Sequence, residues 1–274
     1  MPCKNDILQV LMRCCIAFCI MLIALVSLPG ITPAQPYYFR HYQVENGLSN
    51  NTVLCGRQDK TGFLWFGTKD GLNRFDGYRF RRFNPQNPVS QHPITYNPIT
   101  GLFVDQDGSM YVGADGGLYL YHADEERLSV LIDSIRFVHN ILADTRHNLW
   151  FIADGAICHF NTVTKKMQRL PHPNHAYITS LDLDAEGNLW CATATGFVEK
   201  YNESTGSFIA YNVFSHSKPV ATGLLQKILI GGNKMYIGSY EQGIKEFDLP
   251  SKTYKDLLIY NEDKTNVIVR DILQ

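Results

Sequence analysis

The fold follows from one stretch of sequence, Val53-Leu-Cys-Gly-Arg-Gln-Asp59-Lys-Thr-Gly62-Phe-Leu-Trp65-Phe-Gly67-Thr68, which continues as Gly71-Leu-Asn-Arg-Phe75-Asp76. An apolar segment leads into an Asp-x-x-Gly turn, and a second apolar segment that contains a tryptophan follows. The aspartate suits the start of a tight turn, and the glycine accepts the positive φ that such a turn requires. A further glycine-containing turn precedes a third extended segment, so the stretch predicts short antiparallel strands.

This stretch is repeated along the rest of the chain. An aromatic anchor on the second segment marks each copy, with spacings of 46, 39, 40 and 46 residues between Trp65, Tyr111, Trp150, Trp190 and Tyr236. In four copies an aspartate precedes the anchor by six residues: Asp59, Asp105, Asp144 and Asp184. A residue tolerant of left-handed backbone angles precedes it by three: Gly62, Gly108, His147, Gly187 and Asn233. In the fifth copy Ile230 replaces the aspartate.

Each copy has the length and content of a β-propeller blade, in which four antiparallel strands form one sheet. The predicted fold is therefore an all-β propeller with five blades, at 50–84, 98–132, 137–171, 177–212 and 223–259. One blade cannot bury both of its faces alone. The anchor aromatics are thus expected to be structural and to pack between neighbouring blades, rather than to stack on a ligand.

Residues 1–34 have the order of a secretory signal peptide. Two basic residues precede an apolar run at 14–28, Pro29-Gly30 breaks it, and small residues stand at the two positions that a signal peptidase reads. The alternative is a permanent membrane anchor, but the run is shorter than the ~20 residues of a spanning helix. Cleavage after Ala34 would leave 35–274 as the propeller segment.

The last residues repeat the start of a copy. Val269-Arg-Asp-Ile-Leu-Gln274 matches Val53-Leu-Cys-Gly-Arg-Gln58, so residues 267–274 are expected to form the opening strand of a sixth blade. A closed propeller has no exposed sheet edge of this kind. The sequence therefore predicts a fragment or a truncated gene model.

The first copy resembles the two-component regulator propeller repeat. The resemblance is carried by Phe39-Arg-His-Tyr-Gln-Val-Glu-Asn-Gly-Leu-Ser-Asn-Asn-Thr-Val53, by the turn and strand at 59–68 and by Asp70-Gly-Leu-Asn-Arg-Phe-Asp-Gly77. More narrowly, the chain is similar to the N-terminal periplasmic sensor region of Bacteroidetes-type hybrid two-component systems. The resemblance extends over about 37–274 and implies a seven-bladed parent ring.

What the resemblance implies is a sensor of oligosaccharides released from glycans. In that family two propellers and a β-sandwich precede a membrane helix, a histidine kinase and a response regulator, and 35–274 carries no sequence pattern for the later parts. The expected location is the periplasm, with the full-length parent anchored in the inner membrane. The expected partners are an oligosaccharide, the remaining propeller, membrane and kinase regions of the parent, and a second copy in a homodimer.

The composition argues against several other classes of protein. The chain has 274 residues and a net charge of −1, whereas a nucleic-acid-binding protein usually has a marked basic excess. The three cysteines after the signal peptide, Cys55, Cys158 and Cys191, form neither a disulfide framework nor a metal motif. Asp105-Gln-Asp107-Gly108 is similar to the opening of a calcium loop, but Gly116 stands where a glutamate ligand belongs. No metal and no cofactor is expected.

No catalytic constellation stands out in the sequence. The nine histidines are scattered, and three of them lie in expected interblade loops: His92, His172 and His175. We find neither a Gly-x-Ser-x-Gly elbow nor a pair of carboxylates outside the repeat pattern. The chain is therefore not expected to be an enzyme. Two alternatives to a sensor remain, a non-signalling interaction scaffold and a propeller lyase.

The expected ligand-binding place is the rim where the turns between second and third strands meet the interblade loops. These turns carry Lys69, Asp70, Asp115, Asp154, Tyr240 and Glu241. Sugar recognition requires hydrogen-bonding groups beside an aromatic ring, and this set offers both. The alternative is that each of them is simply a solvated turn residue, because loops are generally exposed.

Overall fold

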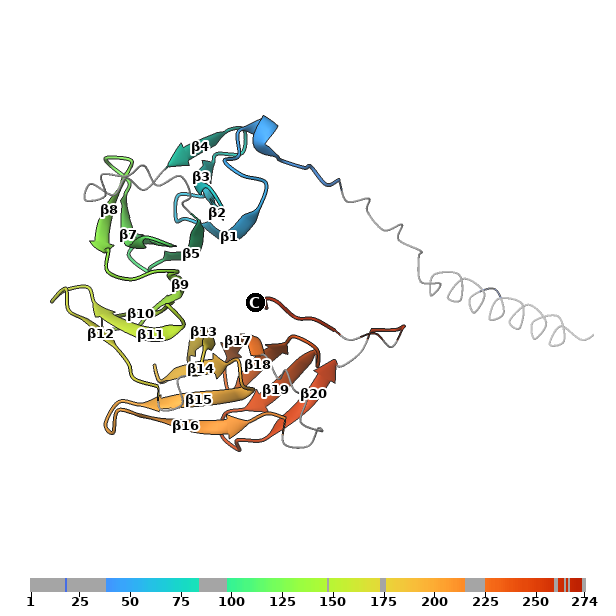
Figure 1. Cartoon of the computed structure of the whole chain (residues 1–274). Coiled ribbons are helices and arrows are strands. Elements are labelled where there is room, and N and C mark those ends of the chain that lie inside the picture. Colours follow the sequence, from blue (N-terminus) through green and yellow to red (C-terminus); the bar gives the residue numbers. More distant parts are fainter. Residues whose placement is uncertain are drawn as a thin grey trace, which may run out of the picture. The chain divides into compact units, whose positions relative to one another are not determined.

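The computed structural model describes residues 18, 38–83, 98–146, 148–172, 176–214, 225–258, 261–263, 265 and 267–272 (Figure 1). The chain divides into two compact units, Met1–His41 and Tyr42–Gln274. Outside the described residues lie the predicted signal peptide at 1–34, apart from Phe18, together with His92, His147, His175 and the end of the predicted opening strand at 273–274. Within the described part, no helix has the length and apolar character needed to cross a membrane.

The described strands form five four-stranded antiparallel sheets, each with its strands in chain order. The first three sheets comprise β1 (Val53–Gln58), β2 (Leu64–Thr68), β3 (Gly71–Phe75), β4 (Phe80–Phe83), β5 (Ile99–Val104), β6 (Met110–Ala114), β7 (Gly117–His122), β8 (Arg127–Ile132), β9 (His139–Ala143), β10 (Asn148–Ala153), β11 (Ala156–Asn161) and β12 (Met167–Arg169). The last two comprise β13 (Ile178–Leu183), β14 (Leu189–Thr193), β15 (Phe197–Asn202), β16 (Ser207–Asn212), β17 (Leu225–Gly231), β18 (Lys234–Ser239), β19 (Ile244–Asp248) and β20 (Tyr254–Leu258). A short 3-10 helix, η1 (Val44–Asn46), precedes them. The predicted all-β fold is confirmed.

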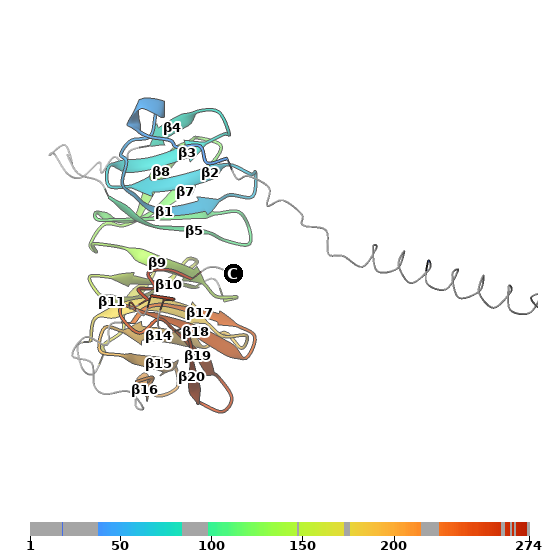
Figure 2. The same cartoon turned by 90° about the vertical axis from the view of Figure 1, so that its right-hand side faces the viewer.

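Neighbouring sheets pack through their first strands. β1 lies against β5, β5 against β9, β9 against β13, and β13 against β17. Figures 1 and 2 show the five sheets following one another with these strands on the inner side, as blades of a propeller do. Since strands alternate in direction, the first and third turns of every blade lie on one face, here called the odd-turn face. The second turns and the links between blades lie on the opposite, even-turn face.

The Asp-x-x-Gly turns form as the repeat predicts. The Asp59 carboxylate accepts hydrogen bonds from the backbone N–H of Thr61 at 2.9 Å and of Phe63 at 3.0 Å, and Gly62 has a φ of 94°. The fifth copy differs from the expectation for Asn233. Its β17–β18 turn has only two residues, and Gly232 takes the positive φ, 59°, because glycine has no Cβ to clash there.

Four of the five anchor rings are buried between sheets. The exposed fractions of Trp65, Tyr111, Trp150 and Trp190 are 1%, 6%, 4% and 0%. Trp65 packs with residues of β5, β6 and β7, and Trp190 packs with residues of β17, β18 and β19. Each ring thus fills the interface with the following blade. Tyr236, on the last described sheet, is half-buried.

The repeated aspartate has a second role that the sequence analysis missed. Its Oδ2 atom accepts a hydrogen bond from the anchor's indole Nε1–H, at 2.7 Å for Asp59–Trp65, 3.2 Å for Asp144–Trp150 and 3.0 Å for Asp184–Trp190. A buried indole N–H needs an acceptor. In the second copy the anchor is a tyrosine, and the Asp105 carboxylate instead accepts from the backbone N–H of Gln106.

Glycines near the end of the second strands admit the start of the next blade. A Cβ on Gly113 would lie 2.2 Å from the carbonyl oxygen of Val138, whose N–H donates to the carbonyl of Ala114 at 3.2 Å. Val269 repeats this arrangement on the fifth blade. Its N–H donates to the Ser239 carbonyl at 3.0 Å, and its Cγ1 lies 2.6 Å from where a Cβ on Gly238 would stand. The described residues 267–272 form no strand, but they contact the fifth blade at the place where a following blade would begin.

The three described cysteines are free, with Cys158 and Cys191 buried and Cys55 half-buried. Burial raises the pKa of all three thiols, to about 12 for Cys55. A thiol is a nucleophile only as the thiolate, so these cysteines act as small apolar core residues.

Candidate functional site

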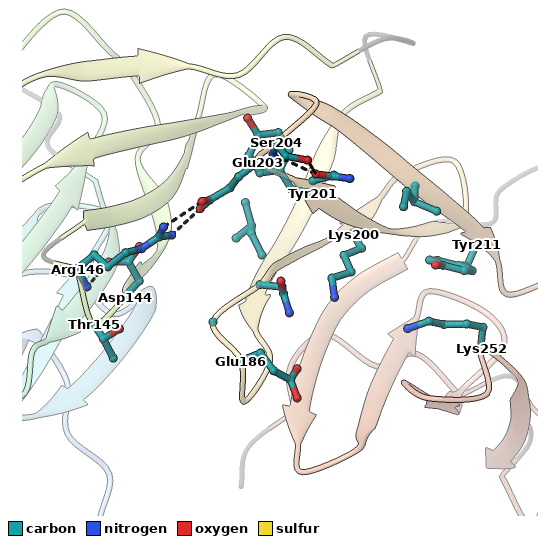
Figure 3. Close-up of a pocket in the computed structure, with 15 residues that line it drawn as sticks. Asp144, Thr145, Arg146, Glu186, Lys200, Tyr201, Glu203, Ser204, Tyr211 and Lys252 are labelled. Atoms are coloured by element: carbon teal, nitrogen blue, oxygen red, sulfur yellow. Dashed lines mark hydrogen bonds and ion pairs between the residues drawn. The ribbon is translucent and has the colours of Figure 1, made fainter.

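A cavity of about 740 Å³ opens on the odd-turn face of the third, fourth and fifth blades (Figure 3). This volume lies within the range of pockets that hold small ligands. The turns that follow β9, β13, β15 and β19 supply most of the wall, together with side chains of β15 and β16. The polar and aromatic lining includes Asp144, Arg146, Glu186, Lys200, Tyr201, Glu203, Tyr211 and Lys252.

One end of the cavity is closed by an ion pair between blades. The Arg146 guanidinium donates two hydrogen bonds to the Glu203 carboxylate, at 2.5 and 3.0 Å, and its Nη2 lies 3.5 Å from Asp144 Oδ2. The hydrogen bonds from Arg146 hold the pKa of Glu203 below its usual value. Because planar bidentate pairs of this kind fix geometry as well as charge, the pair ties the β9–β10 turn to the β15–β16 turn.

A buried carboxylate lies beside the cavity, next to Lys200 of its lining. Asp184 accepts hydrogen bonds from the Trp190 indole at 3.0 Å and the Asn188 backbone N–H at 2.8 Å, while Lys200 Nζ lies 3.6 Å away. Burial by itself would raise the pKa of Asp184, but the bonds from Trp190 and Asn188 outweigh it, and the pKa is lowered. The group is therefore a carboxylate at neutral pH.

The opposite end combines cations with apolar surface. Figure 3 shows Lys200 between the Arg146–Glu203 pair and a second group formed by Tyr211 and Lys252. Ile209, which also lines the cavity, is 46% exposed. Hydrogen-bond donors and acceptors thus surround an aromatic and aliphatic patch. This arrangement suits the polar rim and the apolar face of a sugar ring.

Acid should weaken the fold through the three indole-bonded aspartates. The pKa of Asp59, Asp144 and Asp184 is in each case below the 3.8 of an ordinary aspartate, because hydrogen bonds to the carboxylate outweigh burial. Their stabilisation is complete above the unfolded-state pKa and is lost as the pH falls through the folded-state values. We therefore expect the urea midpoint to drop as the pH falls below about 4, and Asp184→Asn to flatten that drop. An unchanged profile in this variant would contradict the assignment.

The structure brings two of the residues predicted as ligand-binding into ion pairs. Asp115 lies 3.2 Å from the Arg136 guanidinium, and Asp154 lies 2.8 Å from that of Arg169. The carbonyl of Arg136 also accepts the N–H of Asp154 at 3.0 Å. Arg136 thus joins the second turns of the second and third blades on the even-turn face.

The other four predicted residues lie in the second turns of the first and fifth blades. Lys69 and Asp70 are exposed, and the N–H of Asp70 donates to Thr68 Oγ1 at 3.0 Å. Tyr240 is 37% exposed, and Glu241 is half-buried. None of the six predicted residues lines the 740 Å³ cavity, which lies on the opposite face. Their role in binding stays a prediction.

A second cavity, of about 420 Å³, lies on the even-turn face and includes Asp154, Arg169 and His172 in its lining. His172 Nε2 lies 2.6 Å from Glu199 Oε2, and the exposed fractions of the two side chains are 8% and 6%. The buried Nδ1 of His172 has no hydrogen-bond partner among the described residues.

His172 was predicted to lie in a loop, and its partner Glu199 was not predicted. The two residues are 27 positions apart, and no local motif links them. The available signal was a glutamate beside the apolar Val198. Across the described residues, no group of three His, Cys, Asp or Glu side chains is placed to hold a metal.

The sequence of this chain matches a histidine kinase, and its fold matches proteins of several different functions. No family model matches the chain. Over 75 residues, which is 27% of this chain and 6% of the relative, it is 36% identical to histidine kinase P4 of Formosa agariphila. The extracellular domain of a hybrid two-component system from B. thetaiotaomicron matches with a TM-score of 0.62 and 19% identity, over 75% of this chain and 27% of that one.

The chain is similar to two-component sensors. The resemblance predicted from the sequence is confirmed at this level, in fold by the sensor domain and in sequence by the kinase. Virginiamycin B lyase from Staphylococcus aureus also matches, with a TM-score of 0.61 and 13% identity, over 77% of this chain and 71% of the lyase. At such identities the structural matches show a propeller fold alone.

Proposed function

We propose that this chain is a ligand-sensing propeller segment of a two-component regulatory system and that it responds to oligosaccharides from glycan breakdown. The observation that carries the proposal is the 36% identity with a histidine kinase over 75 residues. The fold cannot carry it, because sensors and a lyase share it. The sequence match favours a sensor over a lyase, since the protein that it matches is a histidine kinase.

The 740 Å³ cavity supports the ligand class. It offers carboxylates, ammonium groups and hydroxyls for the polar edge of a sugar, and Tyr211 and Ile209 for its apolar face. Its wall comes from three consecutive blades. A ligand there would contact all three, and its binding energy would favour one relative arrangement of them.

The remaining parts of the proposal concern location and partners. Residues 1–34 serve as a signal peptide, and the propeller works in the periplasm. Further propeller, membrane and kinase regions of a parent sensor, and a second copy in a homodimer, would transmit the signal. The chain spans only 6% of the length of the kinase that it matches, so these regions are part of the proposal.

Calorimetric titration against a panel of oligosaccharides tests this function. We expect one class of oligosaccharide to bind and to raise the unfolding temperature, since a ligand at 100 times its Kd adds about 2.7 kcal/mol of stability. New unsaturated sugar ends after incubation would instead support the lyase. If no oligosaccharide gives a heat of binding or raises the unfolding temperature, the result would favour the interaction scaffold.

A further inference from the structure

Two lysines converge on one buried aromatic ring at the edge of the 740 Å³ cavity. Lys200 Nζ, from β15, lies 5.7 Å from the centre of the Trp190 ring. Lys252 Nζ, from the β19–β20 turn, lies 4.9 Å from the same ring and 5.6 Å from the Tyr211 ring. The ring faces attract both cations, but this brings two like charges into one part of the cavity.

The positive charge of this pair is only partly balanced. Lys200 lies 3.6 Å from Asp184, but that carboxylate already accepts hydrogen bonds from Trp190 and Asn188. Lys252 forms no ion pair within the described part of the chain; its ammonium rests on aromatic rings. Burial lowers the pKa of Lys252 and the charge of Lys200 lowers it further, while Asp184, Asp248 and Glu186 act in the opposite direction.

The other charged side chains that line the cavity are either paired with one another or exposed. Arg146 is held by Glu203 and Asp144, so its single positive charge is already more than balanced by these two carboxylates at the far end. Glu186 is the remaining carboxylate of the lining, and it is exposed. A bound anion near Lys200 and Lys252 would therefore meet two ammonium groups in a partly desolvated place, where charge-assisted hydrogen bonds are strong.

We propose that this cavity binds an acidic oligosaccharide, with a carboxylate or sulfate group held between Lys200 and Lys252. The sugar ring lies on the apolar patch of Tyr211 and Ile209, where its C–H face replaces water. This inference rests on the proposed function and narrows its ligand class from oligosaccharides in general to those that carry a uronate or a sulfate ester.

The repeat supplies a matched control for Lys252. Lys165 occupies the same position in the β11–β12 turn of the third blade. Its φ is 58° against 60° for Lys252, and each N–H donates at 2.9 Å to the carbonyl four residues earlier. Lys165 does not line the cavity. Lys252→Gln and Lys165→Gln therefore make the same chemical change in the same turn, and only the first removes a cation from the proposed site.

The test is calorimetric titration of the full chain with three oligosaccharides of equal length, one galacturonate-based, one sulfated and one neutral. We expect at least one acidic ligand to bind about tenfold or more tightly than the neutral one, and Lys252→Gln to lose most of that preference. Lys165→Gln should bind as the unchanged protein does. Comparison of the galacturonate-based with the sulfated oligosaccharide identifies which acidic group is recognised. Added salt should weaken acidic binding, because exposed charges are screened.

Different negative results contradict different parts of the proposal. Equal binding of neutral and acidic ligands overturns the acidic-ligand inference and leaves the proposed function standing. Acidic binding that Lys252→Gln leaves unchanged, or that Lys165→Gln weakens equally, overturns the assignment to this cavity. If none of the three oligosaccharides binds, the acidic-ligand inference fails, and the proposed function fails with it only when the wider panel also shows no binding. Thermal unfolding of each variant shows that the fold is retained.

Discussion

Replacement of Gly113 by alanine is expected to lower the free energy of unfolding by about 3 kcal/mol. The added Cβ would lie 2.2 Å from the Val138 carbonyl oxygen and 2.9 Å from its carbonyl carbon. Both are backbone atoms, so no rotamer change can relieve the overlap. The start of β9 has to move away from β6, and the hydrogen bond from the Val138 N–H to the Ala114 carbonyl is lengthened or lost.

Gly56→Ala is the matched control for this change. A Cβ there meets its nearest atoms at 3.6 Å, an ordinary contact distance, and its φ is not in the left-handed region. Alanine is also less costly than glycine in a strand, so this variant should be neutral or slightly more stable. Denaturant unfolding of both variants provides the measurement. Equal midpoints would show that the blades do not approach each other as closely as described.

The blades were predictable because their signals are local and repeated. A turn aspartate, a glycine and an anchor aromatic at fixed offsets return several times, and each acts within one hairpin, as at Asp59, Gly62 and Trp65. The bond from aspartate to indole was predictable in principle from the constant six-residue offset. From the sequence, that aspartate was assigned to the turn alone, and no acceptor was assigned to the indole N–H.

The candidate sites were much less predictable, because they join residues from different blades. Arg146 and Glu203 are 57 residues apart, and Lys252 meets Trp190 only because the fourth and fifth blades are neighbours. The six residues predicted for binding came from one turn type on the even-turn face. Nothing in the sequence indicates that blades three to five enclose a larger cavity on the other face, since that depends on side-chain packing around the turns.

Asp184→Ala is expected to cost about 3 kcal/mol of unfolding free energy, because it leaves a buried donor without an acceptor. The Trp190 indole, at 0% exposure, loses its acceptor at 3.0 Å, and the Asn188 backbone N–H loses one at 2.8 Å. Water cannot readily replace the carboxylate within the interface of the fourth and fifth blades. Tryptophan fluorescence during urea unfolding should report both the lower midpoint and a changed indole environment.

Asp105→Ala tests whether this cost comes from the indole bond or from the turn. Asp105 holds the same place in the second blade, but its carboxylate bonds to the Gln106 N–H and the anchor there is Tyr111. We expect this variant to lose about 1 kcal/mol or less, as for a turn aspartate near the surface. Asp184→Asn should recover part of the loss at neutral pH, because its amide oxygen can still accept from the indole. Equal losses of unfolding free energy for Asp184→Ala and Asp105→Ala would mean that the aspartate stabilises the turn alone. The hydrogen bond to the indole would then add nothing measurable to the stability of the interface between blades.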